Sequence, residues 1–204
     1  MNFKKNFKKI TALAAVMAMA LSMAACGADN AADNTDTAAE STSAAENAAE
    51  TAEILNFIPP EKGEKIAVMT VKDYGEIKIK LFPEAASKGV ENFIGLADMN
   101  YYDELIFHRV IPHFMDQGGD PQGTGMGGQS MWGGSFDGGI PEGLYHFSGA
   151  IAYANSGSTS TNGSQFYIVN TDEGECVSDV SSYPQNVQDM YKEKGGVPYL
   201  DGGY

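Results

Sequence analysis

The sequence predicts a mainly β domain that follows a long N-terminal region of different composition. Residues 65–71 and 76–81 alternate as β-strands do, and the turn-like run Asp73-Tyr74-Gly75 joins them, so together they predict an antiparallel hairpin. Two further strand-like runs occupy residues 150–155 and 164–169. The 24 glycines among 204 residues add many positions at which the backbone can turn. A chain of this length corresponds to one domain with appendages.

Residues 1–25 have the composition of a secretory signal peptide. Four lysines give it a positive start, an apolar and alanine-rich run follows at residues 10–23, and the segment is too short and wrongly flanked to span a membrane. Its end, Ala24-Ala25-Cys26-Gly27, resembles the lipobox of bacterial lipoproteins. That resemblance implies a lipid on Cys26 and a location on the extracytoplasmic face of the cell membrane. The alternative is an ordinary signal peptide with an incidental cysteine.

Residues 26–58 predict a disordered acidic tether that carries Cys26 at its start. Between residues 27 and 56 there are seven acidic residues, no basic residue and few large apolar side chains. Such a segment buries too little apolar surface to offset the entropy lost on ordering. We therefore place the folded domain at residues 59–204.

One amphipathic helix is predicted after the hairpin. Pro83 suits the first turn of a helix, and Asn100 tolerates the left-handed conformation that commonly ends one. The apolar stripe between them consists of Val90, Phe93, Ile94 and Ala97. A second, shorter helix is expected around residues 185–194, within an insertion at residues 171–198.

Arg109 is the most unusual residue of the chain, because it is the only arginine and lies in an apolar, strand-like run at residues 107–111. Phe114, Met115, Gln117 and then a glycine-rich stretch follow this run. A guanidinium holds a planar fork of donors beside an apolar patch, which a lysine ammonium does poorly. A functional role and a structural ion pair both fit Arg109 taken alone.

Composition and motif context exclude several other functions. A net charge of −14 repels phosphate backbones, so we expect no nucleic-acid partner. Residues 123–128 match the dinucleotide-binding G-x-G-x-x-G pattern but lack the strand before it and the helix after it. The histidines, His108, His113 and His146, have neither metal-cluster nor Ser-His-Asp spacing, so we expect no metal and no cofactor. His108 is better explained as a hydrogen-bonded core residue than as a metal ligand.

Two segments resemble the signature blocks of the cyclophilins, the cyclophilin-type peptidyl-prolyl cis-trans isomerases. They are residues 107–119, FHRVIPHFMDQGG, and residues 162–168, NGSQFYI. The resemblance implies a closed antiparallel barrel of eight strands capped by two helices. The family continues past Leu200-Asp201-Gly202 into further strands, so it also implies missing C-terminal strands, through either a truncated sequence or an open barrel.

The resemblance also assigns site residues. Arg109 corresponds to the catalytic arginine, and Phe114 and Gln117 complete the catalytic set. The residues implied to bind substrate are Met115, Ala154, Asn155, Gln165, Phe166, Tyr167, Leu200, His108 and Gly125. Tyr167 stands where a phenylalanine is usual, and we expect its extra hydroxyl to narrow the proline pocket.

The implied activity is cis-trans isomerisation of X-Pro bonds in exported proteins by a membrane-tethered folding catalyst. Rotation about such a bond faces a barrier of about 18–20 kcal/mol because it destroys amide resonance. No bond is broken, so the required groups are an apolar surface that binds the prolyl ring and a hydrogen-bond donor for the prolyl nitrogen. Expected partners are proline-containing peptides and unfolded exported proteins, and we expect a monomer. The alternative is a catalytically weak or silent proline-peptide-binding or chaperone module on the same fold.

Overall fold

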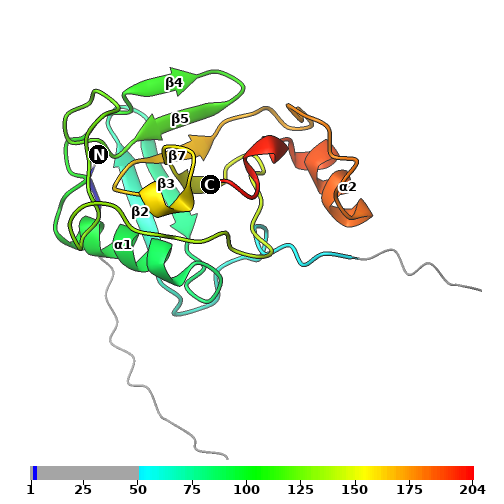
Figure 1. Ribbon diagram of the computed structural model, residues 1–204, viewed down its shortest axis with the longest axis horizontal. Helices are drawn as coiled ribbons and strands as arrows, with labels where there is room; N and C mark the ends of the chain where they lie inside the picture. The colour runs from blue at the N-terminus through cyan, green and yellow to red at the C-terminus, as the bar shows by residue number, and fades with distance from the viewer. Residues whose placement is uncertain (1, 4–50) are drawn as a thin grey trace, which may run out of the picture. The chain divides into compact units, whose positions relative to one another are not determined.

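The computed structural model describes residues 2–3 and 51–204, which form seven strands and two α-helices (Figure 1). The strands are β1 (Asn2–Phe3), β2 (Ile66–Val71), β3 (Gly75–Lys80), β4 (Arg109–Ile111), β5 (Met115–Gly118), β6 (Ile151–Tyr153) and β7 (Phe166–Val169). The helices are α1 (Ser87–Asp98) and α2 (Gln185–Lys194), with short 3-10 helices at Thr159–Thr161 and Pro198–Leu200. No described helix is long and apolar enough to cross a membrane. Cys26 and, apart from residues 2–3, the predicted signal peptide lie outside the described residues.

The predicted hairpin is confirmed. β2 and β3 pair antiparallel, from Ile66 opposite Lys80 to Val71 opposite Gly75. The turn between them requires positive φ angles of 66° at Asp73 and 101° at Gly75, which an aspartate and a glycine tolerate. β1 pairs with the other edge of β2 over two residues, so these strands form one sheet in the order β1-β2-β3.

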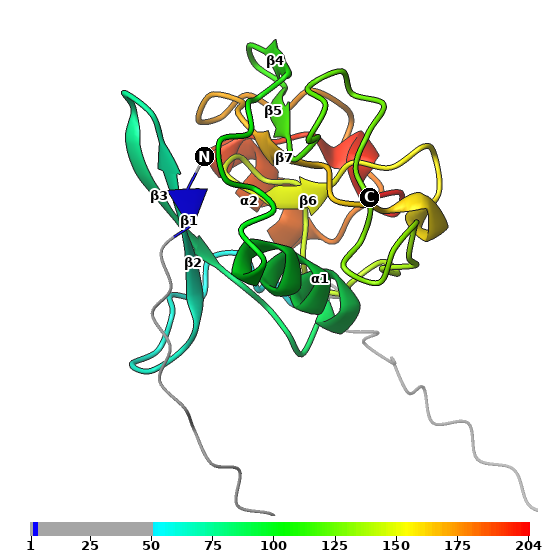
Figure 2. The ribbon, with the colours of Figure 1, turned by 90° about the vertical axis from the view of Figure 1, so that its left-hand side faces the viewer.

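The strands do not close into the eight-stranded barrel that the family resemblance implies. β4 to β7 form a second antiparallel sheet in the order β4-β5-β7-β6, and no ladder among the described residues joins it to the first sheet. Figure 2 shows the β2–β3 hairpin standing to one side of the four-stranded sheet. A sheet closes into a barrel only when its two edge strands pair with each other by hydrogen bonds. A cavity of about 530 Å³ is lined by residues of β3, α1, β6 and β7 together with residues from the segments 56–60 and 138–150.

Helix α1 begins four residues later than the sequence pattern predicts, at Ser87 rather than at Pro83. Residues 83–86 form turns instead, and Ala86 has non-helical angles, with φ −130° and ψ 52°. The predicted end is confirmed, because Asn100, just beyond the helix, has a φ of 56°. Helix α2 spans the range that the sequence predicts for the second helix.

The apolar face of α1 packs against both sheets. Phe93 and Leu96 of the helix share a core cluster with Met69 of β2, Ile79 of β3 and Phe166 of β7. All five are at most 8% exposed. Burying each large apolar side chain stabilises the fold by about 1.5–3 kcal/mol relative to leaving it exposed. The helix therefore holds the two sheets together, although no hydrogen-bond ladder between described residues joins them.

The folded unit starts before residue 59, because residues 52–58 are docked. Ala52 and Asn186 of α2 exchange two hydrogen bonds, at 3.2 and 2.7 Å. Asn56 makes two more with the backbone of Tyr145, at 2.9 and 3.0 Å. The predicted tether boundary at residue 58 is therefore wrong. Composition averaged over the acidic segment hides the apolar residues at its end, which are Ile54, Leu55 and Phe57.

Asn92 of α1 ties the helix to two other parts of the domain. It is fully buried, and its Nδ2 donates to the Tyr153 hydroxyl and the Gly163 carbonyl, both at 2.9 Å. Its Oδ1 accepts the N–H of Met131 at 2.8 Å. All hydrogen-bonding atoms of this buried amide are thus satisfied.

The variant Asn92→Ala should lower the free energy of unfolding by about 2–4 kcal/mol, since it leaves two partly buried backbone groups, the Gly163 carbonyl and the Met131 N–H, without their partner. Urea denaturation measures this change. Lys88→Ala, on the exposed side of the same helix, is the matched control and should change stability little. Equal unfolding midpoints for Asn92→Ala and the parent chain would contradict the assigned role.

Candidate active site

Arg109 and Gln117 face each other across the β4–β5 ladder and form the centre of the site. They are register partners, and Arg109 Nη1 donates to Gln117 Oε1 at 3.4 Å. The arginine is exposed, and within the described part of the chain no carboxylate lies within 4.0 Å of it. For these residues the structural ion-pair interpretation of Arg109 is wrong. The guanidinium can therefore donate to a ligand.

Two glutamine amides in series fix the orientation of Gln117. Gln117 Nε2 donates to Gln165 Oε1 at 2.9 Å, and Gln165 Nε2 donates to the carbonyls of Gly125 and Gly127 at 3.0 and 2.8 Å. Only an amide nitrogen can face two carbonyl oxygens, so the direction of both amides is determined. Gln117 Oε1 then faces Arg109 and accepts a long hydrogen bond from its guanidinium.

The loop that supplies these carbonyls is organised by Asp120, which is buried. Its carboxylate accepts the backbone N–H groups of Gln122, Thr124, Gly125 and Gly127 at 2.7–3.3 Å. Burial by itself would raise the pKa of Asp120, but these hydrogen bonds outweigh burial and lower the pKa from 3.8 to about 2. The loop is therefore ordered around a carboxylate that is ionised at neutral pH.

The apolar floor of the site lies on the same sheet as Arg109. Its buried members include Met115, Tyr167 and Leu200, with Phe114 and Ala154 packed against them. The centre of the Phe114 ring is 5.9 Å from the guanidinium carbon of Arg109, which is a cation–π distance. The site thus combines an oriented cationic donor with an apolar surface.

Phe166 and His108, which the resemblance assigns to substrate binding, have environments that differ from the expected ones. Phe166 is 1% exposed and lies on the face of β7 opposite Tyr167, where it packs edge-on against Phe93. Phe166 is therefore a core residue, and its assignment to substrate binding is wrong.

His108 lies beside Gly125, and neither of its ring nitrogens has a hydrogen-bond partner among the described residues. The expected hydrogen-bonded core histidine is therefore also wrong.

The side chain of Asn155 is engaged within the protein. Its Nδ2 donates to the Gly203 carbonyl and its Oδ1 accepts the N–H of Gly157, both at 2.9 Å. The preceding residue, Ala154, donates its N–H to the Gln165 carbonyl at 3.0 Å. The Asn155 amide is therefore occupied by contacts within the domain.

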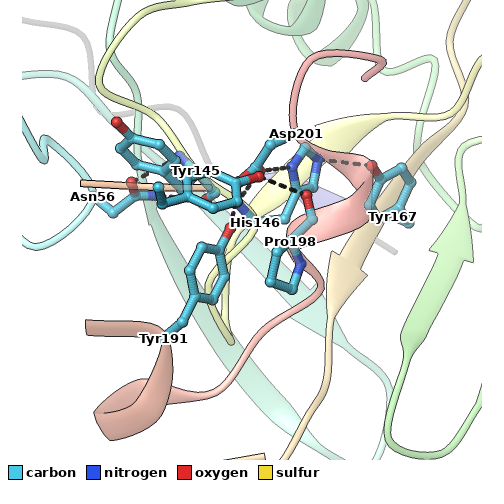
Figure 3. Close-up of polar contacts among 8 residues, drawn as sticks. Asn56, Tyr145, His146, Tyr167, Tyr191, Pro198 and Asp201 are labelled. Carbon is cyan, nitrogen blue, oxygen red and sulfur yellow. Dashed lines mark hydrogen bonds and ion pairs between the residues drawn. The ribbon is translucent and has the colours of Figure 1, made fainter. Parts of the chain in front are cut away.

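The sequence reasoning missed the polar group behind Tyr167 (Figure 3). The Tyr167 hydroxyl lies 2.8 Å from His146 Nε2, and His146 Nδ1 lies 2.6 Å from Asp201 Oδ1. The hydroxyl is engaged by this buried pair, so the expectation that it narrows the pocket is wrong. A buried phenol needs a hydrogen-bond partner. The tyrosine at position 167 was therefore the signal that could have led to His146.

Among the described residues, His113, Asp172 and Glu175 could together hold a cation. His113 Nδ1 is 2.9 Å from Glu175 Oε2 and 3.2 Å from Asp172 Oδ2, and all three side chains are exposed. The hydrogen bond to Glu175 and the charges of both acids raise the pKa of His113 above its usual 6.5. Ion pairing therefore accounts for the arrangement, which links the β4–β5 turn to the loop at residues 171–176.

Comparison with known proteins gives consistent matches. The family profile described as cyclophilin type peptidyl-prolyl cis-trans isomerase/CLD matches residues 66–188. A Staphylococcus aureus protein named as a peptidyl-prolyl cis-trans isomerase is 46% identical over 145 residues, which cover 69% of this chain and 73% of that protein. A Streptococcus pyogenes protein named as a bifunctional phosphatase/peptidyl-prolyl cis-trans isomerase is 46% identical over 142 residues. That match covers 68% of this chain but 30% of the streptococcal protein.

The fold comparison agrees with these matches. The crystal structure of a Cryptosporidium parvum cyclophilin type peptidyl-prolyl cis-trans isomerase, determined in the presence of the dipeptide Ala-Pro, is similar with a TM-score of 0.53. The two chains are 33% identical, and the similarity covers 69% of this chain and 74% of the other. The chain belongs to the cyclophilin-type peptidyl-prolyl cis-trans isomerases, a family of enzymes.

The variant Asp120→Asn should lose about 2 kcal/mol of stability at pH 7, because a pKa lowered from 3.8 to about 2 corresponds to roughly 1.4 kcal/mol per pH unit. The pKa is lower in the folded state, so this contribution is fully present above about pH 4 and is lost as the pH falls toward 2. Urea unfolding at pH 7 and at pH 3 should therefore show a difference from the parent chain that shrinks with acid. The exposed Glu142→Gln is the control. A difference independent of pH would contradict the role of the carboxylate.

Proposed function

We propose that this domain accelerates cis–trans isomerisation of X-Pro bonds in exported proteins. The observation that carries the proposal is the Arg109 guanidinium, held by Gln117 beside an apolar surface that includes Phe114. Such a surface seats a prolyl ring, and a charged donor next to it reaches the prolyl nitrogen. The Cryptosporidium relative was crystallised in the presence of Ala-Pro, which supports proline-containing peptides as ligands of this site.

Arg109 would assist the reaction by stabilising the twisted amide. In the planar amide the nitrogen lone pair is delocalised, and rotation about the C–N bond localises it so that it can accept a hydrogen bond. The interaction is therefore stronger in the transition state than in the ground state, as catalysis requires. A charge-assisted hydrogen bond contributes about 1.5–3 kcal/mol. An acceleration of about 10⁵-fold requires about 7 kcal/mol, so the apolar seat and the fixed donor orientation would supply the remainder.

A catalytically silent proline-peptide-binding module is the second candidate. The hydroxyl of Tyr167 favours it, because a phenylalanine is usual at this position in the family that the sequence resembles. NMR exchange spectroscopy on a proline-containing peptide separates the two functions. Binding without accelerated exchange between the cis and trans forms would establish the silent module.

The proposed place of action is the extracytoplasmic face of the membrane, with a lipid on Cys26 as the anchor. The support is the sequence pattern before the domain, which has a positive start, an apolar run and the sequence Ala24-Ala25-Cys26-Gly27. Unfolded exported proteins are the proposed clients. We propose that the domain acts on them as a monomer, since one chain supplies both Arg109 and the apolar floor.

The variant Arg109→Ala should lower kcat/KM for a proline-containing peptide by about ten- to hundredfold, the change that corresponds to loss of a charge-assisted hydrogen bond. Arg109→Lys should retain part of the activity, because lysine keeps the charge but not the planar fork. A protease-coupled isomerisation assay measures both rates. Lys78→Ala, an exposed cation on β3, is the control and should be as active as the parent chain. Equal rates for the parent chain and Arg109→Ala would overturn the mechanism.

The variant Cys26→Ser should move the protein from the membrane fraction to the soluble extracytoplasmic fraction, since it removes the acceptor of the proposed lipid. Cell fractionation of the chain expressed with its own N-terminal segment measures this. Cys176→Ser, the matched control within the domain, should stay with the membranes. Unchanged membrane association of Cys26→Ser would rule out the lipid anchor.

A further inference from the structure

A buried polar chain of three residues lies behind the apolar floor of the site (Figure 3). Tyr167 comes from β7, His146 from the loop before β6, and Asp201 from the turn after the 3-10 helix Pro198–Leu200. Two contacts connect them, Tyr167 hydroxyl to His146 Nε2 at 2.8 Å and His146 Nδ1 to Asp201 Oδ1 at 2.6 Å. Tyr167 is 4% exposed and His146 is 6% exposed. The chain is therefore largely shielded from water.

The donors around Asp201 determine the direction of these hydrogen bonds. Oδ1 also accepts the backbone N–H of His146 at 2.8 Å, and Oδ2 accepts the hydroxyl of Tyr191 at 2.6 Å. The Tyr183 hydroxyl lies 3.0 Å from Oδ2 and 2.9 Å from the Pro198 carbonyl, so its hydrogen is shared between them. An ionised carboxylate only accepts hydrogen bonds. His146 Nδ1 must therefore carry the hydrogen that faces Asp201.

An imidazole whose single hydrogen is on Nδ1 has an acceptor at Nε2. In this tautomer the Tyr167 hydroxyl donates to His146. Burial raises the pKa of Tyr167 far above its usual value, which keeps the phenol protonated and able to donate. The order of donation therefore runs from Tyr167 to His146 and from His146 to Asp201.

The ring of Tyr167 is at the same time part of the apolar floor. It packs in one cluster with Met115, Leu200 and Phe114, and its backbone is opposite Gln117 in the β5–β7 ladder. The ladder fixes one end of the side chain and His146 fixes the other. A tyrosine has two rotatable side-chain bonds, so restraint at both ends determines the position of its ring.

We propose that His146 and Asp201 are positioning residues of the site, which act through the Tyr167 hydroxyl to fix the aromatic surface on which the prolyl ring rests. The proposal takes the identity of the ligand from the proposed function. It accounts for a tyrosine at a position where phenylalanine is usual, because the hydroxyl is drawn into the buried chain. Neither His146 nor Asp201 needs to touch the substrate.

A double-mutant cycle on the full chain tests this inference. Tyr167→Phe removes the hydroxyl and keeps the ring, and His146→Gln removes the imidazole and keeps a polar side chain. Each single substitution should raise the Kd of a proline-containing tetrapeptide and lower kcat/KM by about three- to tenfold, the change that corresponds to one hydrogen bond. In the Tyr167→Phe background, His146→Gln should have no further effect, because it acts only through the hydroxyl.

Tyr102→Phe is the matched control background. It removes another buried hydroxyl, which donates to the Ser164 carbonyl at 3.2 Å in a different cluster. In that background His146→Gln should keep its whole effect. Equal effects of His146→Gln in the Tyr167→Phe and Tyr102→Phe backgrounds would show that His146 only supports the fold, and would overturn the proposal. Urea midpoints measured on every variant establish that the compared chains are folded.

Nitrogen-15 NMR provides a second readout that does not depend on activity. His146 should carry its hydrogen on Nδ1 and none on Nε2, and the opposite tautomer would overturn the inference. A parent chain that binds the peptide without isomerising it would refute the proposed function. The double-mutant cycle would then be measured from the Kd values alone, and it would still decide the role of His146. A parent chain that does not bind the peptide would overturn both.

Discussion

The two hydrogen bonds from Gln165 Nε2 to the carbonyls of Gly125 and Gly127 determine the geometry of the polar half of the site. They set the direction of the Gln165 amide, which sets the direction of the Gln117 amide and presents Gln117 Oε1 to the guanidinium of Arg109. The same two glycines donate their backbone N–H groups to the carboxylate of Asp120, which fixes the path of the loop. The position of the cationic donor thus depends on a loop whose own order depends on one buried charge.

The site requires only one of the two sheets. Its polar and apolar members lie on β4, β5 and β7, which are neighbours in the four-stranded sheet, and on segments packed against that sheet. The β2–β3 hairpin contributes to the core under α1 and not to the site. An open arrangement of the two sheets is therefore compatible with an ordered active site.

The strand-borne part of the site could be predicted from the sequence. Arg109, Gln117 and Tyr167 lie on strand-like runs, and side-chain alternation places Phe166 on the face opposite Tyr167, although family resemblance assigned it to substrate binding. The partners that hold them could not be predicted. Asp120 and His146 lie in loops, where neither periodicity nor spacing indicates which backbone or side-chain groups will meet. The docking of residues 52–58 was hidden for a different reason, because a few apolar side chains follow a long acidic segment.

The glycine-rich loop contributes to the polar half of the site through backbone atoms alone, since Gln165 uses only the carbonyls of Gly125 and Gly127. The side chain of Met126, which lies between these two glycines, takes no part in those hydrogen bonds and is 89% exposed. Substitutions at position 126 can therefore accumulate without moving Arg109, as long as the loop keeps its path. Under the proposed function, preference among peptide sequences can change at this rim of the site while Arg109 and its partners stay in place.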